Sequence, residues 1–517
     1  MSFIPSAILR KLYKRKSLKN VHHGVSFVMN NRLSEASLTA IHEISIDGRE
    51  ADLAGVSFTP TQGGESRDAA SISTESPLVI KLGEQVHVKV QTSPLEPGKH
   101  HLELVFTCSP FGKLRLNVDE ELEDEEAECT HIPRDSDDDY SPEAVERRRE
   151  YARKRSGQQF THLFQDSYDP HLVRGNCESY VGHATIPVGL AGPLLVEGEH
   201  AQGEFLVPMA TTEGTLLASY NRGMKLLREC GGVKATVVGD SMQRAPVFVF
   251  EDARGGRKFV NWVVRHLETI REVAQATSSV ARLKYIDYYL SHRFAYLRFN
   301  FTTGDAAGQN MVGKATFAAC NWIIENYEEG RIQNFFLESN FATDKKASMI
   351  NTMRGRGKRV TAEATLSRQA LLDVMGVDSK ILAYHNGVAN VGAWMAGANN
   401  NGLHSANAIT AIFIATGQDV ANVAESSSAV IYTELVDNDD LYFSITIPSL
   451  IVATYGGGTG LPTQRECLEM MGCWGEGKVF KLAEIIAAAV LAGELSLACA
   501  ISSLDWVAAH ERIGRNR

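Results

Sequence analysis

The chain has 517 residues, of which 44% are hydrophobic and 22% charged, and it carries a formal net charge of −10. This length exceeds one ordinary hydrophobic core, so we expect two to four domains in a chain with the composition of a soluble globular protein. The acidic balance argues against nucleic-acid binding as the main task, because phosphate backbones require clustered Lys and Arg.

Eight cysteines are scattered singly along the chain, and no CxxC pair occurs. This spacing indicates neither a zinc site nor a disulfide framework, so we expect no bound metal. Basic residues at positions 11 and 14–16 interrupt any signal-peptide core near the first residue. The longest apolar stretch, residues 485–492, is too short to span a membrane. We therefore predict a cytoplasmic protein that does not bind membranes.

Residues 1–118 alternate apolar and polar positions in short runs, as in residues 86–91 and 102–106. Turn signals such as Asp47-Gly48 separate the runs. Period-two alternation with regular turns predicts an antiparallel β sandwich. Nothing in this region points to catalysis, and we expect a domain that is unrelated to the rest of the chain.

Short stretches of this first domain resemble the small β subunit of bacterial C-glycoside deglycosidases. The stretches are residues 9–13, 17–20, 31–33 and 46–48. Because the resemblance covers this domain alone and its motifs are short, it implies a fold and not an activity.

Residues 119–156 form the predicted connection to the second half of the chain. Acidic runs at residues 119–128 and 135–139 are typical of a solvated linker. Ser141 followed by Pro142 then signals a helix start, with Ser as the N-cap and Pro in the first turn.

After residue 175 the pattern changes to long helical segments joined by Gly-rich loops. No strand–turn–helix unit in this region carries a GxGxxG fingerprint. A nicotinamide cofactor would therefore not be held by an ordinary Rossmann turn.

Polar or Gly-rich clusters interrupt the mainly apolar segments of this second half. They are residues 208–214, 302–311, 343–347, 397–419 and 456–460. These clusters supply Glu213, Lys345 and Asp419, and the last residues of the chain add His510. The combination suits carbonyl chemistry, because a lysine can stabilise a developing oxyanion, a carboxylic acid can give a proton, and a histidine can protonate a leaving thiolate.

Each of these side chains also has a structural interpretation. Glu213 fits a first-turn acid that complements a helix dipole, and the adjacent Lys345 and Lys346 fit a solvated surface. Asp419 lies in an apolar segment where burial is expected, and a buried acid needs partners. The residues alone leave both interpretations open.

The cluster at residues 302–311 alternates Gly with small residues. Such a backbone leaves amides free to meet a phosphate, while Asp305 and Asn310 could bind hydroxyl groups. A Gly-Asp turn before a helix is common, however, so this motif by itself is a weak signal of a cofactor site.

Ordered segments of the second half resemble the hydroxymethylglutaryl-CoA reductase family. The segments are residues 186–194, 208–214, 302–310, 344–346, 355–358, 395–397, 415–419, 455–459 and 492–497. They occur in the order and at the spacing of the family's class I members, over residues 157–517.

This resemblance implies an α+β protein in which the N-terminal sandwich precedes a reductase region. The region would contain a large helical, substrate-binding domain at residues 157–244 and 337–500. A small ferredoxin-like domain that binds the nicotinamide cofactor would be inserted at residues 245–336. A C-terminal flap at residues 501–517 would carry His510.

The resemblance also implies a reaction, the two-step, four-electron reduction of an acyl-CoA thioester to mevalonate with release of CoA. Glu213 is similar to the proton-donating acid, Lys345 to the oxyanion-stabilising lysine and Asp419 to the acid that couples them. His510 is similar to the histidine that protonates the departing CoA thiolate. Substrate-binding positions are matched by Arg244, Lys346, Asn407 and Asp344, and cofactor-binding positions by Asp305, Gly308, Asn310, Gly456, Gly457 and Arg515. Family members are dimers or dimers of dimers with active sites at the subunit interface, so a homo-oligomer is implied.

Three positions depart from the family pattern. Glu338 stands where the family has a Ser that helps to hold the substrate carboxylate, and Val388 stands where it has a Lys that pairs with that carboxylate. Ser279 replaces the usual Arg that contacts the 2′-phosphate of NADPH. NADPH is the predicted cofactor, and the Ser279 substitution leaves NADH as its alternative.

Three hypotheses follow. The first is a hydroxymethylglutaryl-CoA reductase, supported by the retained Glu213, Lys345, Asp419 and His510. The second is a reductase of the same fold that acts on another acyl-CoA or carbonyl compound, which Glu338 and Val388 favour. The third is a non-catalytic assembly protein, which the retained catalytic set argues against.

Overall fold

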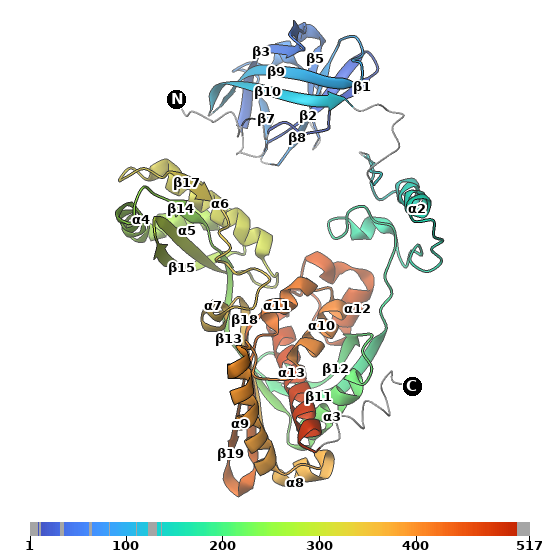
Figure 1. Cartoon of the computed structure of the whole chain (residues 1–517), viewed down its shortest axis with the longest axis vertical. Helices are drawn as coiled ribbons and strands as arrows, with labels where there is room; N and C mark the ends of the chain where they lie inside the picture. Colours follow the sequence, from blue (N-terminus) through green and yellow to red (C-terminus); the bar gives the residue numbers. More distant parts are fainter. Residues whose placement is uncertain are drawn as a thin grey trace. The chain divides into compact units, whose positions relative to one another are not determined.

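The computed structural model describes residues 9, 12–31, 36–61, 65–81, 83–109, 111–122, 132–135 and 137–503. The chain divides into two compact units, Met1–Ile132 and Pro133–Arg517 (Figure 1). The division falls inside the region predicted as a linker. Both units are rich in strands and the second is also rich in helices, which confirms the predicted α+β class.

The N-terminal unit contains two five-stranded sheets whose neighbouring strands are all antiparallel. The strand order is β1-β2-β8-β5-β6 in one sheet and β10-β9-β3-β4 in the other, where β7 also pairs with β3. The elements are β1 (Lys19–Val21), β2 (Gly24–Asn30), β3 (Ala36–Ile46), β4 (Arg49–Glu50), η2 (Leu53–Gly55), β5 (Val56–Pro60), β6 (Arg67–Asp68), η3 (Ala69–Ser71), β7 (Leu78–Ile80), β8 (Gln85–Val90), β9 (Gly98–Ser109) and β10 (Gly112–Leu122).

Alternate residues of these strands are buried, as the period-two pattern predicts. In β8 the side chains of Val88 and Val90 are buried, whereas the intervening Lys89 is exposed. Apolar side chains from both sheets, including Phe58 and Phe106, belong to one core. Strand β10 continues to Leu122 and therefore passes residue 118, the predicted end of this domain.

Helix α2 (Pro142–Ser156) begins where the sequence predicts, because the Ser141 hydroxyl accepts an N–H of the first turn at 3.2 Å. The acidic residues just before α2 are not all solvated, in contrast to the solvated linker that the sequence predicts. Arg148, whose side chain is fully buried, donates to the Asp139 carboxylate at 2.8 Å. Charge pairing therefore folds this stretch against α2.

A ten-stranded sheet forms the frame of the second unit. Its main path is β17-β14-β16-β13-β18-β20-β19, with β12 joined to β11, β11 joined to β13, and β15 joined to β16. The strands are β11 (Val188–Gly198), β12 (Gln202–Ala210), β13 (Val233–Arg244), β14 (Val247–Val249), β15 (Arg282–Ser291), β16 (Phe294–Thr302), β17 (Asn334–Phe336), β18 (Gly357–Leu366), β19 (Val430–Leu435) and β20 (Leu441–Leu450).

Many of the helical elements of this unit pack into its two largest apolar cores. The helices are η4 (Pro170–Val173), α3 (Leu216–Glu229), α4 (Ala253–Arg265), α5 (Leu267–Gln275), α6 (Gln309–Asn326), α7 (Met349–Arg354), α8 (Arg368–Ala370), η5 (Leu371–Met375), α9 (Ser379–Ala396), α10 (Ser405–Thr416), η6 (Val420–Asn422), α11 (Val423–Ser426), η7 (Asp437–Asp439), η8 (Gly457–Gly460), α12 (Pro462–Met470) and α13 (Val479–Ser502). One core contains Phe248, Phe259 and Trp262 and involves α4, α5 and α6, which lie together in Figure 1. The larger core surrounds α13.

Helix α13 packs against α3, α9, α10 and strands β11, β13, β18 and β20. It extends well beyond the apolar stretch expected at residues 485–492, and its length and composition would suffice to cross a membrane. In the structure, 78% of its apolar window is buried inside the protein, as in the core helix of a folded domain. The cytoplasmic location stays a prediction.

Two glycines bring α3 and α13 into close contact. A Cβ atom at Gly493 would lie 2.2 Å from the Tyr220 ring, and one at Gly223 would lie 1.9 Å from the carbonyl oxygen of Ala492. Both distances are far below van der Waals contact. Only glycine at these two positions therefore allows the helices to approach so closely.

We expect Gly493→Ala to lower the free energy of unfolding of the second unit by about 2–3 kcal/mol, because the added methyl group overpacks the helix contact. Urea denaturation followed by far-ultraviolet circular dichroism measures the change. Gly313→Ala in α6 is the matched control, since its Cβ would lie 3.5 Å from its nearest neighbour. Equal losses in the two variants would contradict this account of the contact.

Candidate active site

Lys345 and Asp419 form an ion pair, with 2.9 Å between the ammonium nitrogen and the carboxylate oxygen Oδ2. Lys345 lies in the loop between β17 and α7, and Asp419 follows the end of α10. Both side chains are slightly more than two-fifths exposed, so the pair is open to a ligand. The hydrogen bond from Lys345 to Asp419 raises the lysine pKa, and the charges of Asp419, Asp344 and Glu425 raise it further. The ammonium group is therefore held protonated, as an oxyanion-stabilising group must be.

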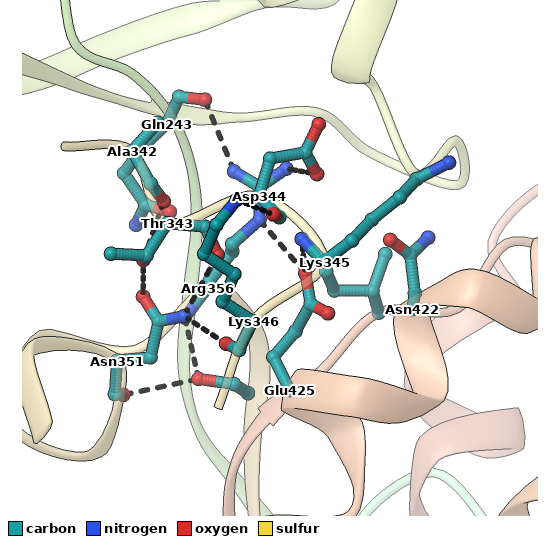
Figure 2. Close-up of polar contacts among 12 residues, drawn as sticks. Gln243, Ala342, Thr343, Asp344, Lys345, Lys346, Asn351, Arg356, Asn422 and Glu425 are labelled. Carbon is teal, nitrogen blue, oxygen red and sulfur yellow. Dashed lines mark hydrogen bonds and ion pairs between the residues drawn. The ribbon is translucent and has the colours of Figure 1, made fainter. Parts of the chain in front are cut away.

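A charged network surrounds the Lys345 loop (Figure 2). The fully buried Arg356 donates to Asp344 at 2.5 Å and to Glu425 at 3.1 Å. The Lys346 ammonium group donates to the backbone oxygen of Asp344 at 3.1 Å. The predicted Asp344, Lys345 and Lys346 thus share one loop that a buried guanidinium supports.

Arg244, the residue matched to substrate recognition, stands near two carboxylates. Its Nη1 atom lies 3.6 Å from Glu338 and 3.8 Å from Asp344, and its Nη2 atom donates to the backbone oxygen of Gln309 at 3.2 Å. Glu338, expected to alter this site, therefore contacts the predicted substrate-binding arginine. The positive charge of Arg244 is partly balanced by the chain's own acids.

Glu213 and Asn407 form a second pair, in which the Asn407 amide donates to the Glu213 carboxylate at 2.8 Å. Helix α3 has Thr215 as its N-cap and no acid in its first turn. Glu213 therefore precedes the helix, and its interpretation as a first-turn acid is wrong. Instead its exposed carboxylate faces Asn407 in the first turn of α10.

The two pairs belong to opposite ends of α10. Asn407 lies in the first turn, whereas Asp419 follows the last residue, Thr416. At 1.5 Å per residue, the axial distance from Asn407 to Thr416 is roughly 14 Å. Within one chain, the Glu213–Asn407 pair and the Lys345–Asp419 pair therefore lie at opposite ends of α10.

A cleft of about 650 Å³ lies beside the Lys345 pair. Asp419 contributes to its wall together with four of the residues matched to cofactor binding, namely Gly308, Asn310, Gly456 and Gly457. Gly308 has φ +80°, and a Cβ at this position would lie 2.2 Å from the Thr303 side chain. The Gly-rich clusters, which are far apart in sequence, therefore line one cavity.

Asp305 makes contacts that its predicted role did not anticipate. Its carboxylate accepts the backbone N–H groups of Gly477, Lys478 and Val479 at 2.8–3.1 Å, at the start of α13. These bonds occupy both carboxylate oxygens and anchor the helix terminus. A role for Asp305 in binding a cofactor hydroxyl group stays a prediction.

His510 and Arg515 lie outside the described residues. Among the residues that are described, one group has the ligand atoms of a metal site within 4.8 Å of one another: Glu199, His200 and Glu484. The Glu484 oxygen Oε2 already accepts the N–H groups of His200 and Ala201, so this carboxylate holds the β11–β12 turn. The expectation of no bound metal stays a prediction.

Sequence reasoning missed Glu425 and assigned no role to Arg356, although Arg356 lies in a quoted segment. Glu425 stands between an alanine and three serines, and a glutamate in such a stretch carries no distinctive local signal. Its importance comes from the fold, which places α11 against the Lys345 loop.

Comparison with known proteins shows which family the chain belongs to. The family model described as "Hydroxymethylglutaryl-coenzyme A reductase" matches residues 144–515. The 3-hydroxy-3-methylglutaryl-coenzyme A reductase of Methanocaldococcus jannaschii is 42% identical over 377 residues, which cover 72% of this chain and 93% of the relative. The chain belongs to the hydroxymethylglutaryl-coenzyme A reductase family. The class I resemblance is therefore confirmed.

Further matches agree with this family. The 3-hydroxy-3-methylglutaryl-coenzyme A reductase of Aeropyrum pernix is 42% identical over 380 residues, 72% of this chain and 90% of the relative. A solved structure of the class II reductase from Streptococcus pneumoniae, bound to NADPH in open conformations, shares the fold with a TM-score of 0.53 and 21% identity. It covers 70% of this chain and 93% of that one.

The N-terminal unit has its own match in this family. Residues 8–123 match a model described as "Hydroxymethylglutaryl-CoA reductase, N-terminal domain". The domain expected to be unrelated to the rest of the chain therefore occurs with hydroxymethylglutaryl-CoA reductases, which corrects that expectation. The resemblance to the deglycosidase β subunit stays a prediction.

We expect Asp419→Asn to lower the pKa of Lys345, because the hydrogen bond to Asp419 is the largest cause of its elevation. A lysine with a raised pKa stays protonated to higher pH, and only its neutral form reacts with an acylating reagent. Lys345 should therefore be acylated several-fold faster in the variant at neutral pH, as measured by peptide mass spectrometry. Lys346 is the internal control, and an unchanged Lys345 rate would contradict the account.

Proposed function

We propose that this chain reduces 3-hydroxy-3-methylglutaryl-coenzyme A to mevalonate with NADPH and releases CoA. The observation that carries the proposal is the Lys345–Asp419 ion pair at 2.9 Å, whose Asp419 lines the cleft, in a member of this reductase family. The ammonium group is open to a ligand and held protonated, which is the arrangement that a thioester carbonyl needs in order to accept a hydride.

The residues around the cleft fit a nicotinamide dinucleotide. A cavity of about 650 Å³ is within the range of cofactor sites. At Gly308, Gly456 and Gly457 the wall carries no side chain, so backbone amides at these positions can approach a pyrophosphate. When bound, the cofactor supplies one hydride in each of the two reductions.

The chain's own residues supply the remaining chemistry. Lys345 donates a hydrogen bond to the carbonyl oxygen and stabilises the negative charge that develops there, and Asp419 orients the ammonium group. When the carbon–sulfur bond breaks, the CoA thiolate takes one proton, for which we propose His510. Glu213 supplies the other proton, to the alcohol oxygen. Two hydrides and two protons thus convert the thioester into a primary alcohol and a thiol.

The domains take the roles that the family implies. In this proposal residues 245–336 form the inserted ferredoxin-like cofactor domain, which is supported by their separate core around Phe259 and Trp262. The N-terminal unit is a β sandwich, supported by the shared core of its two sheets. The segment with His510 and Arg515 acts as a flap.

A reductase of the same fold with another acyl-CoA substrate is the second candidate. The contact between Arg244 and Glu338 favours it, because an internal carboxylate competes for the cation that would hold the substrate's free carboxylate. Val388, which is 54% exposed on α9, offers no compensating charge.

The first experiment is oxidation of NADPH or NADH by the purified protein in the presence of 3-hydroxy-3-methylglutaryl-CoA. We expect turnover with CoA release, and a loss of kcat of roughly 100-fold or more in Lys345→Ala, since the variant lacks the oxyanion-stabilising cation. NADPH is the preferred cofactor in this proposal, because the exposed Arg282, which donates to the Ser279 backbone oxygen at 2.8 Å, puts a guanidinium beside Ser279. Cofactor binding without turnover would instead favour the second candidate, and faster turnover with NADH would overturn the cofactor preference.

We further propose a homodimer, alone or paired into a dimer of dimers, in which each active site combines both pairs. Its support is the separation of the Glu213 and Lys345 pairs along α10, which one chain cannot close. Helix α9 also exposes an apolar face in the described structure, with Trp394 83%, Met395 76% and Tyr384 74% exposed. Such a face is typical of a subunit interface.

Subunit complementation tests this arrangement. Glu213→Gln and Lys345→Ala should each be inactive alone. Co-expression should restore about a quarter of wild-type activity, because half of randomly formed dimers are mixed and each mixed dimer has one intact site. Co-expression of Lys345→Ala with Asp419→Asn is the control and should restore nothing, since both residues lie on one side of the site. No recovery in the first mixture would contradict an interfacial site.

A further inference from the structure

A buried carboxylate, Glu425 of α11, lies next to the Lys345 loop (Figure 2). Its side chain is fully buried, and its Oε1 atom accepts the backbone N–H of Lys345 at 3.0 Å. Lys345 itself has φ +55°, in the left-handed region that side chains other than glycine rarely occupy. The hydrogen bond that Lys345 donates to Glu425 therefore holds the left-handed backbone conformation in which the lysine side chain pairs with Asp419.

Arg356 couples this carboxylate to the rest of the loop. The guanidinium is fully buried, and it donates to Glu425 at 3.1 Å, to Asp344 at 2.5 Å and to the backbone oxygen of Gln243 at 3.2 Å. A single cation thus stands between two carboxylates. Asp344 also lies 3.8 Å from Arg244, whereas Glu425 has Arg356 and the Lys345 loop as its contacts.

The second oxygen of Glu425 has a distinct environment. Oε2 is buried and has no hydrogen-bond partner. Both donors, the Lys345 amide and the Arg356 guanidinium, bind Oε1. A neutral amide oxygen could accept both bonds, but its bond from the guanidinium would be weaker than that of a carboxylate. The negative charge therefore acts on the buried Arg356 by direct contact and lies beside the Lys345 loop.

The charges around Lys345 agree with this geometry. The charge of Glu425, together with those of Asp419 and Asp344, raises the pKa of Lys345, after the larger effect of the Asp419 hydrogen bond. Burial raises the pKa of Glu425 itself, and the charge of Arg356 opposes that rise.

We propose that Glu425 is a positioning residue for Lys345, whose buried carboxylate holds the left-handed backbone conformation of the lysine and places a negative charge beside its loop. The inference rests on the proposed function, in which Lys345 stabilises the oxyanion. It adds a buried residue that touches neither substrate nor cofactor and acts through Lys345 alone.

The test uses Glu425→Gln in the full-length protein, because glutamine retains the acceptor oxygen and removes only the charge. Glu484→Gln is the matched control. Glu484 is also fully buried, also accepts two N–H groups through one oxygen, and also has a second oxygen without a partner, but it lies at the β11–β12 turn.

Acylation of Lys345 across a pH series, followed by peptide mass spectrometry, is the first readout and requires no substrate. We expect the curve for Glu425→Gln to move to lower pH, in the same direction as for Asp419→Asn, and the curve for Glu484→Gln to match wild type. Superimposable curves for wild type and Glu425→Gln would overturn the proposed effect of the charge. Because this measurement is independent of turnover, it remains decisive if the substrate is not 3-hydroxy-3-methylglutaryl-CoA.

Steady-state kinetics is the second readout. We expect kcat of Glu425→Gln to fall about tenfold or more, with KM for acyl-CoA and cofactor changed less than about twofold, because the lost interaction acts on the transition state. If Glu425→Gln does not fold, Glu425→Asp replaces it. Aspartate keeps the charge, but its shorter side chain moves the carboxylate away from the Lys345 N–H. A wild-type kcat in Glu425→Asp would therefore overturn the positioning role.

Discussion

The second unit depends on burying α13, an apolar helix that carries two glutamates into the core. A charge in such surroundings is costly unless it is fully hydrogen-bonded. Glu494, whose pKa is raised by burial, accepts the backbone N–H groups of Leu403 and His404 at 2.5 and 2.9 Å and the hydroxyl of Ser405. The requirement to satisfy this carboxylate therefore fixes the chain where α10 begins.

Helix α3 also stabilises the start of α10. The Tyr220 hydroxyl of α3 donates to the His404 backbone oxygen at 2.6 Å and accepts the N–H of Ala408 at 3.0 Å. Tyr220 in turn packs on Gly493 of α13. Asn407, which contacts Glu213, thus sits in a helical turn that is anchored by both neighbouring helices.

The other end of α10 is organised by charge. Asp419 follows the helix and pairs with Lys345, while α11, immediately afterwards, places Glu425 behind the same lysine. The two ends carry the two halves of the proposed reaction, proton donation by Glu213 and oxyanion stabilisation by Lys345. A rigid helix keeps these halves apart within one chain, which is the physical reason that the proposed active site requires two subunits.

The sequence alone indicated the family, the α+β class and the start of α2 after its N-cap Ser141, and it singled out Glu213, Lys345, Asp419 and Asn407 as candidate site residues, because these depend on local motifs and their order. It did not reveal that Asp305 caps α13, that Asp139 pairs with Arg148, or that the apolar run at residues 485–492 belongs to a buried helix of 24 residues. Nor did it reveal Glu425, which is an ordinary glutamate until the fold brings it to Lys345. Each of these contacts joins residues that are distant in sequence or depends on burial, and only tertiary packing decides which polar groups lose water and must find partners.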